Sequence, residues 1–477
     1  MLLTLFALAL SPAQAAELSL DDALRAARLH NPQLRSASLV LDQQRALLAG
    51  TMASADPVLT ASTARTGADS VGFIGGTPFT ASSSGQAHDL SISGQGARGT
   101  AWTLYSGLDL DDTTTVSPFA GAEGETTQTN WSTEVGVQLQ QDLLVPFRRT
   151  PGLEARLDAF AAVERASLEA RQTEQSVLAD VAEAWWDAWL LAARVDVAVR
   201  GVAEAERLMA RTQALVDEGA SVPVEASRAQ LALLQARREL LTARSRADSA
   251  EDQLLISVGL SPDDKLQLVG GPNLGWTAAV PTLSEVQAGS PQLALLRRDL
   301  DTAQRRALDA RRDRLPDLTL TVSGGYSTLQ DSAPQALVAL AGEEAMPRWS
   351  TGLSLSVPLG GRSAKATSDR RDAEMRQAEL ALSRQQDAIE ADYVAAVATL
   401  ETSRASLDIA RVQVEVAALT EAGEAARVQT GARRLDVLLD ARDDRQAAEL
   451  GLLEAQVDVA RAGLRLARLA GTVQGVR

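Results

Sequence analysis

The carboxylates with the clearest capacity to act together lie in the segment QTGARRLDVLLDARDDRQ, residues 429–446. Gly431 interrupts a long helical pattern there, and Asp436 and Asp440 follow it, four positions apart. Side chains at that spacing lie on one face of a helix, so the two acids would form a negative patch that attracts cations. The neighbouring Arg residues allow a second interpretation, in which ordinary ion pairs cover a solvated helix face.

Side chains for catalysis or metal binding are scarce in the rest of the sequence. The chain has no Cys and two His, His30 and His88, which fall in different segments. It also lacks the glycine patterns of nucleotide-binding loops. We therefore expect a protein that is not an enzyme, with no cofactor and no metal site.

The composition is typical of long packed helices. Of 477 residues, 45% are hydrophobic but only 3% are aromatic, and Ala, Leu, Arg, Glu and Gln dominate long windows. The formal net charge is −16, and the Arg residues form no basic stripe. These features argue against a nucleic-acid partner.

Residues 1–15 have the features of a signal peptide. An apolar run ends in the small-x-small sequence Ala13-Gln14-Ala15, which is typical of an export cleavage site, although no Lys or Arg precedes the run. No later apolar run reaches 18 residues, so we expect no transmembrane helix. An exported chain of this kind is periplasmic, secreted, or inserted in the outer membrane as a β-barrel.

The sequence contains an internal duplication. One constant offset of 259 residues relates three matches: Pro32-Gln33-Leu34 to Pro291-Gln292-Leu293, Asp42 to Asp301, and Pro57 to Pro316. Such a match predicts two structural repeats at 16–260 and 282–470, joined by a Pro- and Gly-rich linker at 261–281.

Each repeat follows the order helix, strand, strand, long helix, break and shorter helix. We expect strands within 57–145 and 316–359, and helical hairpins at 151–260 and 363–470. In the second repeat Leu353 and Leu355 alternate with Ser354 and Ser356. This alternation is typical of a membrane barrel with lipid outside and water inside, and equally of an ordinary half-buried sheet.

The long helices favour an extended assembly. Residues 153–218 contain no Pro and one Gly, enough for a rod of roughly 100 Å. Apolar side chains three or four positions apart, Trp185 and Trp189 among them, predict helix packing in the coiled-coil style. We interpret the Trp residues at 185–189 as core packing rather than a binding site. Rods of this length favour a tube or a fibrous scaffold.

Four segments in this order resemble the TolC family of outer-membrane efflux proteins: LSLDDALRAARLHNPQL, LPDLTLTVSGGY, VPLGGRSAKA and TGARRLDVLLDARDDRQAAEL. The resemblance implies a mainly α fold with β, built from the duplicated repeat. It implies a homotrimer in which each chain gives four strands to one outer-membrane β-barrel of twelve. A long α-helical barrel would extend into the periplasm.

The function that the resemblance implies is a passive exit duct in the cell outer membrane, with a periplasmic extension. Its partners would be outer-membrane lipid, a periplasmic adaptor protein and an inner-membrane transporter, in a tripartite efflux or type I secretion system. Two alternatives are the periplasmic adaptor of such a pump and a periplasmic coiled-coil scaffold. Neither explains strands in both repeats.

The first repeat departs from the family plan. Its strand region is 43 residues longer than that of the second repeat, and the excess near 86–110 reads as an additional hairpin with Gly96 and Gly99 at the turn. This hairpin either extends the barrel wall or stands outside it. Two roles are open for the aromatic residues of the strand regions, an interfacial girdle or packing against loops. These residues are Trp102, Tyr105, Trp131 and Trp349.

The resemblance also assigns residues to the hairpin tips. Gly219 and Gly431 match the tip turns. Rings of Asp narrow the periplasmic entrance in the family, and Asp440 lies at the matching distance from its Gly. Asp436 is displaced by one residue from the usual first acidic position.

A tip latch is implied as well. Arg433 matches a family Arg that ties the closed tips together. Glu225, six residues after the first tip Gly, occupies the position of the acidic partner of that Arg. An exposed bridge between the two is worth about 0–1 kcal/mol.

Overall fold

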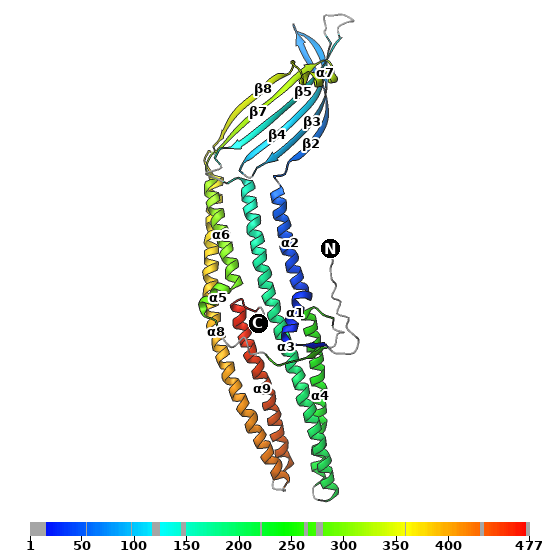
Figure 1. Ribbon diagram of the computed structural model, residues 1–477, viewed down its shortest axis with the longest axis vertical. Coiled ribbons are helices and arrows are strands. Elements are labelled where there is room, and N and C mark those ends of the chain that lie inside the picture. Colours follow the sequence, from blue (N-terminus) through cyan, green and yellow to red (C-terminus); the bar gives the residue numbers. More distant parts are fainter. Residues whose placement is uncertain are drawn as a thin grey trace. The chain divides into compact units, whose positions relative to one another are not determined.

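The computed structural model describes residues 16–53, 55–96, 98–116, 125–144, 149–219, 222–261, 266–272, 280–357, 359–429 and 434–473. The chain divides into two compact units. A sheet unit comprises residues 42–164 and 299–379, and a helical unit comprises residues 1–41, 165–298 and 380–477. Figure 1 labels the elements of both. The expected signal peptide lies outside the described residues.

The sheet unit is built on antiparallel strands in the order β2-β3-β4-β5-β7-β8 (Figure 1). Their bounds are β2 Val58–Ile74, β3 Thr77–Gln95, β4 Thr100–Val116, β5 Glu125–Asp142, β7 Asp317–Gln330 and β8 Met346–Ser356. The short helix α7, Ala333–Leu340, follows β7 and lies against β5 and β7. Strands from both predicted repeats therefore share one sheet.

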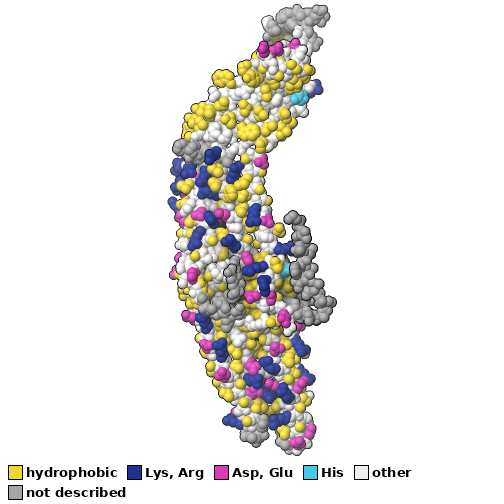
Figure 2. Space-filling model, viewed as in Figure 1, with side chains coloured by type: hydrophobic (Ala, Val, Ile, Leu, Met, Phe, Trp, Pro, Cys, Tyr) yellow, Lys and Arg dark blue, Asp and Glu magenta, His cyan; other side chains and the backbone are white. Residues whose placement is uncertain are grey.

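The strand register sorts the side chains onto two faces. Leu59, Ile92, Leu104 and Val137 lie on one row of cross-strand partners. The adjacent row carries polar or small residues on the opposite face: Thr60, Ser91, Tyr105, Gly136, Gly325 and Arg348. Successive residues of a strand point to opposite faces, which explains the separation. Figure 2 shows hydrophobic side chains spread over the visible surface of this unit, with few charged ones.

Helix α7 covers the apolar face around Thr328, whose hydroxyl donates to the carbonyl of Ala336 at 3.0 Å, and away from α7 the apolar residues are open rather than covered by a second layer. Leu59, Leu355 and Trp349 are 64%, 63% and 80% exposed. An ordinary half-buried sheet would bury such residues, so this face requires an apolar environment outside the chain.

The additional hairpin is part of the sheet. β3 and β4 pair with each other and with β2 and β5 on either side, and Gly96 N–H donates to the carbonyl of Thr100 at 2.6 Å in their turn. Gly99 has φ +75°, which favours glycine. Four strands per chain is therefore wrong for this protein, because the 43 extra residues supply two more.

An interfacial girdle, one of the two roles open to the aromatic residues, would not include Tyr105. Trp102, Trp131 and Trp349 share the apolar face, whereas Tyr105 lies on the polar face and its hydroxyl donates to Glu134 at 3.0 Å. Its neighbour Leu104 occupies the apolar face, and adjacent strand residues cannot share a face.

The helical unit consists of long antiparallel helices and two small strands. The helix bounds are α1 Leu20–His30, α2 Pro32–Ala53, α3 Pro151–Asp217, α4 Pro223–Val258, α5 Leu283–Gly289, α6 Pro291–Arg312, α8 Arg362–Gln429 and α9 Leu435–Leu469. The strands β1, Ala16–Leu18, and β6, Leu266–Leu268, pair in parallel. α2, α3, α6 and α8 each contribute residues to both units. None of the helices in the described part of the chain is both long and apolar enough to span a membrane.

Local signals explain where several helices begin. Ser19 caps α1 through its side chain, which accepts from the N–H of Asp22 at 3.2 Å. Thr282 and Glu285 form a capping box at α5. α2, α3, α4 and α6 begin with Pro, whose missing N–H costs nothing in a first helical turn.

The two repeats end in matching contacts. Gly259 closes α4 with φ +88°, and a Cβ there would lie 2.6 Å from the carbonyl oxygen of His30. Gly471 follows α9 with φ +69°, and a Cβ there would lie 2.3 Å from the carbonyl oxygen of Gly289. His30 and Gly289 each precede the Pro-Gln-Leu motif by two residues, so the duplicated motif marks the place where each hairpin returns.

The main core of this unit surrounds the Trp residues of α3. Trp185 and Trp186 are 0% exposed within a cluster that also includes residues of α1, α4 and α9. Trp185 donates to the carbonyl of Leu18 at 3.3 Å, and Trp189 to that of Gly270 at 2.8 Å. The interpretation of these residues as core packing is confirmed.

Candidate aperture at the helical hairpin tips

The two hairpin tips are formed by the α3–α4 and α8–α9 connections. After α3, Gly219 has φ +74° and its N–H donates to the carbonyl of Val216 at 3.0 Å. α4 then begins with Pro223. α8 ends at Gln429 and α9 begins at Leu435. The second predicted tip residue, Gly431, and the predicted latch residue Arg433 lie outside the described residues.

A small apolar cluster orients the start of α9. Leu435 and Leu438 are 7% and 4% exposed and pack with Leu208 of α3 and Ala229 of α4. Ala441, one turn farther along, is 6% exposed. These three positions define the face of α9 that is turned toward the other helices.

The acids of α9 share the opposite face. At roughly 100° per residue, positions 436, 440, 443 and 444 point away from the buried face. Asp440, Asp443 and Asp444 are exposed, and Asp436 is half-buried. The helix therefore presents a compact set of carboxylates on one side.

Asp436 is partly neutralised by cations. Its Oδ2 lies 3.0 Å from Arg434 and 4.0 Å from Arg228 of α4. Arg228 also donates to Glu225 at 3.3 Å. The predicted latch residue Glu225 and the predicted aperture residue Asp436 thus share one Arg in this chain.

Asp443 lies between two further carboxylates on this face, Asp440 and Asp444. Local desolvation, followed by the negative charges of Asp440 and Asp444, raises the pKa of Asp443. Like charges this close favour binding of a cation or of a proton. This side of α9 can therefore attract cations.

An ion-pair network that sequence reasoning missed lies behind these acids. Glu421 of α8 is 9% exposed and accepts from Arg442 at 3.2 Å and from Arg445 at 2.7 Å. Arg445 also donates to Glu449 at 2.9 Å, and Arg200 of α3 donates to Glu449 at 3.1 Å. The network joins three helices. One signal could have found it, because Glu421 and Arg442 are nearly equidistant from the tip and an antiparallel hairpin places such residues side by side.

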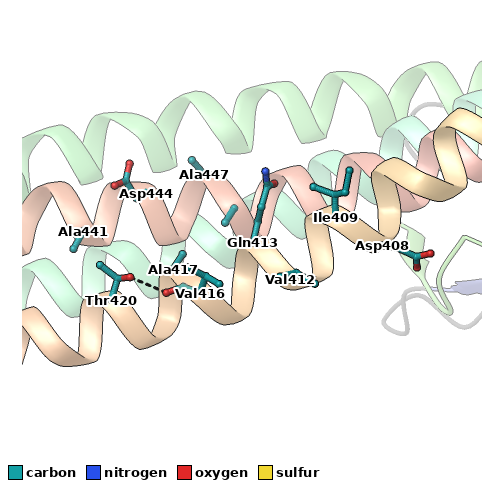
Figure 3. A pocket seen from close by; sticks show the side chains of 11 residues that line it. Asp408, Ile409, Val412, Gln413, Val416, Ala417, Thr420, Ala441, Asp444 and Ala447 are labelled. Atoms are coloured by element: carbon teal, nitrogen blue, oxygen red, sulfur yellow. Dashed lines mark hydrogen bonds between the residues drawn. The ribbon is translucent and has the colours of Figure 1, made fainter.

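A groove runs between α8 and α9 next to this network (Figure 3). Its volume is about 890 Å³. α8 contributes several exposed apolar side chains, with Ile409, Val412 and Val416 each more than half exposed. α9 contributes small residues, including Ala441 and Ala447, together with Asp444. The groove is mainly apolar with carboxylates at its margin.

Comparison with known proteins identifies the chain. The family model "Outer membrane efflux protein" matches residues 23–260 and 282–472. This chain belongs to the outer membrane efflux protein family. The resemblance inferred from the sequence is confirmed, and the adaptor and scaffold alternatives are set aside. As an efflux protein it is an exit duct of the outer membrane with a periplasmic extension, and it is not an enzyme.

Solved structures share the fold of this efflux protein at low sequence identity. The Campylobacter jejuni CmeC outer membrane channel is 13% identical, with a TM-score of 0.68 over 95% of this chain and 85% of that one. The outer membrane protein VceC of Vibrio cholerae is 15% identical, with a TM-score of 0.66 over 95% and 96%. The Neisseria gonorrhoeae MtrE outer membrane channel, in its open state, is 18% identical, with a TM-score of 0.65 over 95% and 88%. No curated protein sequence matches the chain.

Proposed function

We propose that this efflux protein works as a homotrimer, which docks to a periplasmic adaptor protein and an inner-membrane transporter and serves as their passive exit duct. One observation carries the proposal. On a single layer of strands, the sheet unit exposes a band of apolar side chains on one face and polar or small side chains on the other. The apolar side of such a layer needs contact with lipid, and the polar side needs a water-filled lumen that several copies enclose together.

The partners of the duct would meet the helical unit. The apolar groove between α8 and α9 supports docking of a helical partner, because exposed Val and Ile side chains at helical spacing accept the apolar face of another helix. The energy for export would come from the inner-membrane transporter. Both an efflux pump and a type I secretion system fit this arrangement.

The aperture is the second part of the proposal. With the tips turning at Gly219 and Gly431, three copies of α9 would bring Asp440 and its neighbours Asp443 and Asp444 around a common axis. Asp436 would add less charge, because Arg434 and Arg228 already lie beside it. The ring would favour cations and bind multivalent cations.

The latch would involve more residues than a single pair. Glu225 already contacts Arg228 within α4, so an Arg433 from a neighbouring tip would compete with that contact. Weak, exchangeable ion pairs suit an entrance that must open.

The test is assembly and conductance of the purified protein. We expect it in the outer-membrane fraction as a trimer that dissociates on heating, and we expect it to form cation-selective channels in planar bilayers. A monomer confined to the periplasmic fraction would contradict the proposal. A trimer without channel activity would contradict the role as a duct.

A further inference from the structure

We propose that β8 of one copy pairs with β2 of the next in a defined register, so that three copies close a barrel of eighteen strands. This inference rests on the trimer proposed above. It differs from the family expectation in the number of strands and names the residues that meet between copies.

The two outer strands of the sheet offer free edges. Within the described strands, β2 and β8 each have a neighbour on one side only, and they are 17 and 11 residues long. Every described residue of β8 is exposed. Long unpaired edges leave backbone N–H and C=O groups without partners, which is intolerable at the depth of a membrane.

The number of strands allows these edges to pair. Each strand is antiparallel to its neighbour, so the first and last of six run in opposite directions. β8 of one copy can therefore lie antiparallel to β2 of the next. The alternation then continues unbroken around the ring, and six strands from each of three copies make eighteen.

The register follows from the stagger of the sheet. One row of cross-strand partners runs through Val58, Ser93, Thr103, Gln138, Ser323 and Ser350. Val58 begins β2, but Ser350 lies six residues before Ser356, the last residue of β8. These two ends lie at the same border of the sheet. If these strand ends are to lie at one height around the closed barrel, Ser356 must pair with Val58 of the next copy.

This register satisfies two independent conditions. A shift of six residues is even, so each face of one copy continues into the same face of the next. Leu59 then meets Leu355 on the apolar face, and Thr60 meets Ser354 on the polar face. Six residues over six strands is a stagger of one residue per strand. With the usual rise per residue and the usual distance between strands, this stagger tilts the strands by about 35° from the barrel axis. Transmembrane barrels have tilts of roughly 35–45°.

The closed barrel would be wide. Eighteen strands at this tilt give a backbone diameter of about 34 Å, against about 22 Å for twelve strands at the same tilt. The extra hairpin β3–β4 would thus enlarge the outer-membrane exit. Cargo that is too bulky for a twelve-stranded barrel could then pass.

Paired cysteines test the register, and the native chain contains no Cys to interfere. Thr60→Cys with Ser354→Cys, on the polar face, and Leu59→Cys with Leu355→Cys, on the apolar face, are the two expected neighbours between copies. Successive pairs in an antiparallel ladder alternate between wide and close spacing, so one of the two has the geometry for a disulfide. We expect covalent dimers and trimers on a non-reducing gel that disappear with reductant.

The controls separate the possible outcomes. Thr60→Cys with Leu355→Cys places the thiols on opposite faces and should give no ladder. Ser354→Cys and Thr103→Cys would become neighbours only if β8 paired with β4 of the next copy, in a twelve-stranded barrel that leaves β2 and β3 outside. Covalent dimers and trimers from this pair would overturn the inference. A heat-modifiable trimer with no disulfide from either expected pair would overturn it too. If the protein is monomeric in membranes, the proposed trimer fails as well.

Discussion

Arg445 of α9 donates a hydrogen bond of 2.7 Å to Glu421 of α8 across the second hairpin. The side chains are 30% and 12% exposed. Hydrogen bonding to Glu421 raises the pKa of Arg445 above its usual range. The contact clamps the two helices just behind the acidic face of α9.

Replacing Glu421 by Gln should therefore loosen this hairpin. The change removes the charge that two guanidinium groups share, and charge-assisted hydrogen bonds of this kind contribute roughly 1.5–3 kcal/mol. We expect a lower midpoint of thermal unfolding in detergent, followed by circular dichroism at 222 nm. Glu415→Gln, at an exposed position of the same helix, should change the free energy of unfolding by no more than about 0.5 kcal/mol, so its midpoint should stay close to the native one. Equal midpoints for both variants would show that the network is not stabilising.

Removing carboxylates from α9 should reduce the cation preference of the channel. In planar bilayers we expect Asp440→Asn to weaken both cation selectivity and block by multivalent cations on the periplasmic side. Adding Asp443→Asn and Asp444→Asn should weaken them further, because each removes a charge from the same helix face. Asp436→Asn should have a smaller effect, because nearby Arg side chains already offset that charge.

The matched control for the aperture is again Glu415→Gln, which removes one exposed carboxylate from α8. It should retain native selectivity and block. If the triple Asn variant also retains both, the acids of α9 form an ordinary solvated face.

The cation selectivity of the channel should depend on pH. The pKa of Asp443 is raised by desolvation and by the charges of Asp440 and Asp444. The folded protein therefore binds this proton more readily than the unfolded chain does, and the contribution of Asp443 to stability rises as pH falls through the window between the two pKa values.

Protonation of Asp443 should begin at a higher pH than that of an ordinary Asp, and cation selectivity should fall with it. Asp440→Asn removes one of the neighbouring charges and should move the midpoint of this fall to lower pH. Reversal potentials measured across a pH series check this. An unchanged midpoint in the variant would contradict the coupling.

Adjacent residues of β8 should differ sharply in their tolerance of charge. Leu355 lies on the apolar face and Ser354 on the polar one. Leu355→Arg should impair membrane assembly by roughly 2–4 kcal/mol if the residue lies near mid-bilayer, while Ser354→Arg meets water and should be milder. The yield of heat-modifiable protein in the outer-membrane fraction measures this. Similar yields for both variants would remove the assignment of faces.

The glycine that follows α9 should not tolerate a side chain. Gly471→Ala combines a positive φ, which costs an L-residue roughly 1–2 kcal/mol, with a Cβ position 2.3 Å from the carbonyl of Gly289. We expect a lower midpoint of unfolding. Gly451→Ala is the matched control in α9, where a Cβ meets nothing within 4 Å. It should raise stability by about 0.5–1 kcal/mol. Destabilisation of equal size by both changes would contradict the packing argument.

Features with a local physical cause are readable from the sequence. The alternation of Leu353 and Leu355 with Ser354 depends only on the two-residue period of an extended backbone, and it predicts two faces of different polarity. The long helices follow from uninterrupted helical periodicity without Pro. The duplicated Pro-Gln-Leu motif predicts the paired repeats, because it marks the same turn between helices twice.

Features that depend on which segments become neighbours required the folded chain. Alternation does not say which strand pairs with which, so the place of the β3–β4 hairpin inside the sheet came from its register with β2 and β5. Helical periodicity does not name the partners of a charge, so Glu421 as the acceptor for Arg442 and Arg445, and Arg228 beside Asp436, emerged only with the packing of α4, α8 and α9. Ion pairs and strand pairs between distant segments form where packing brings their atoms within a few ångströms, and no periodicity along one segment encodes that distance.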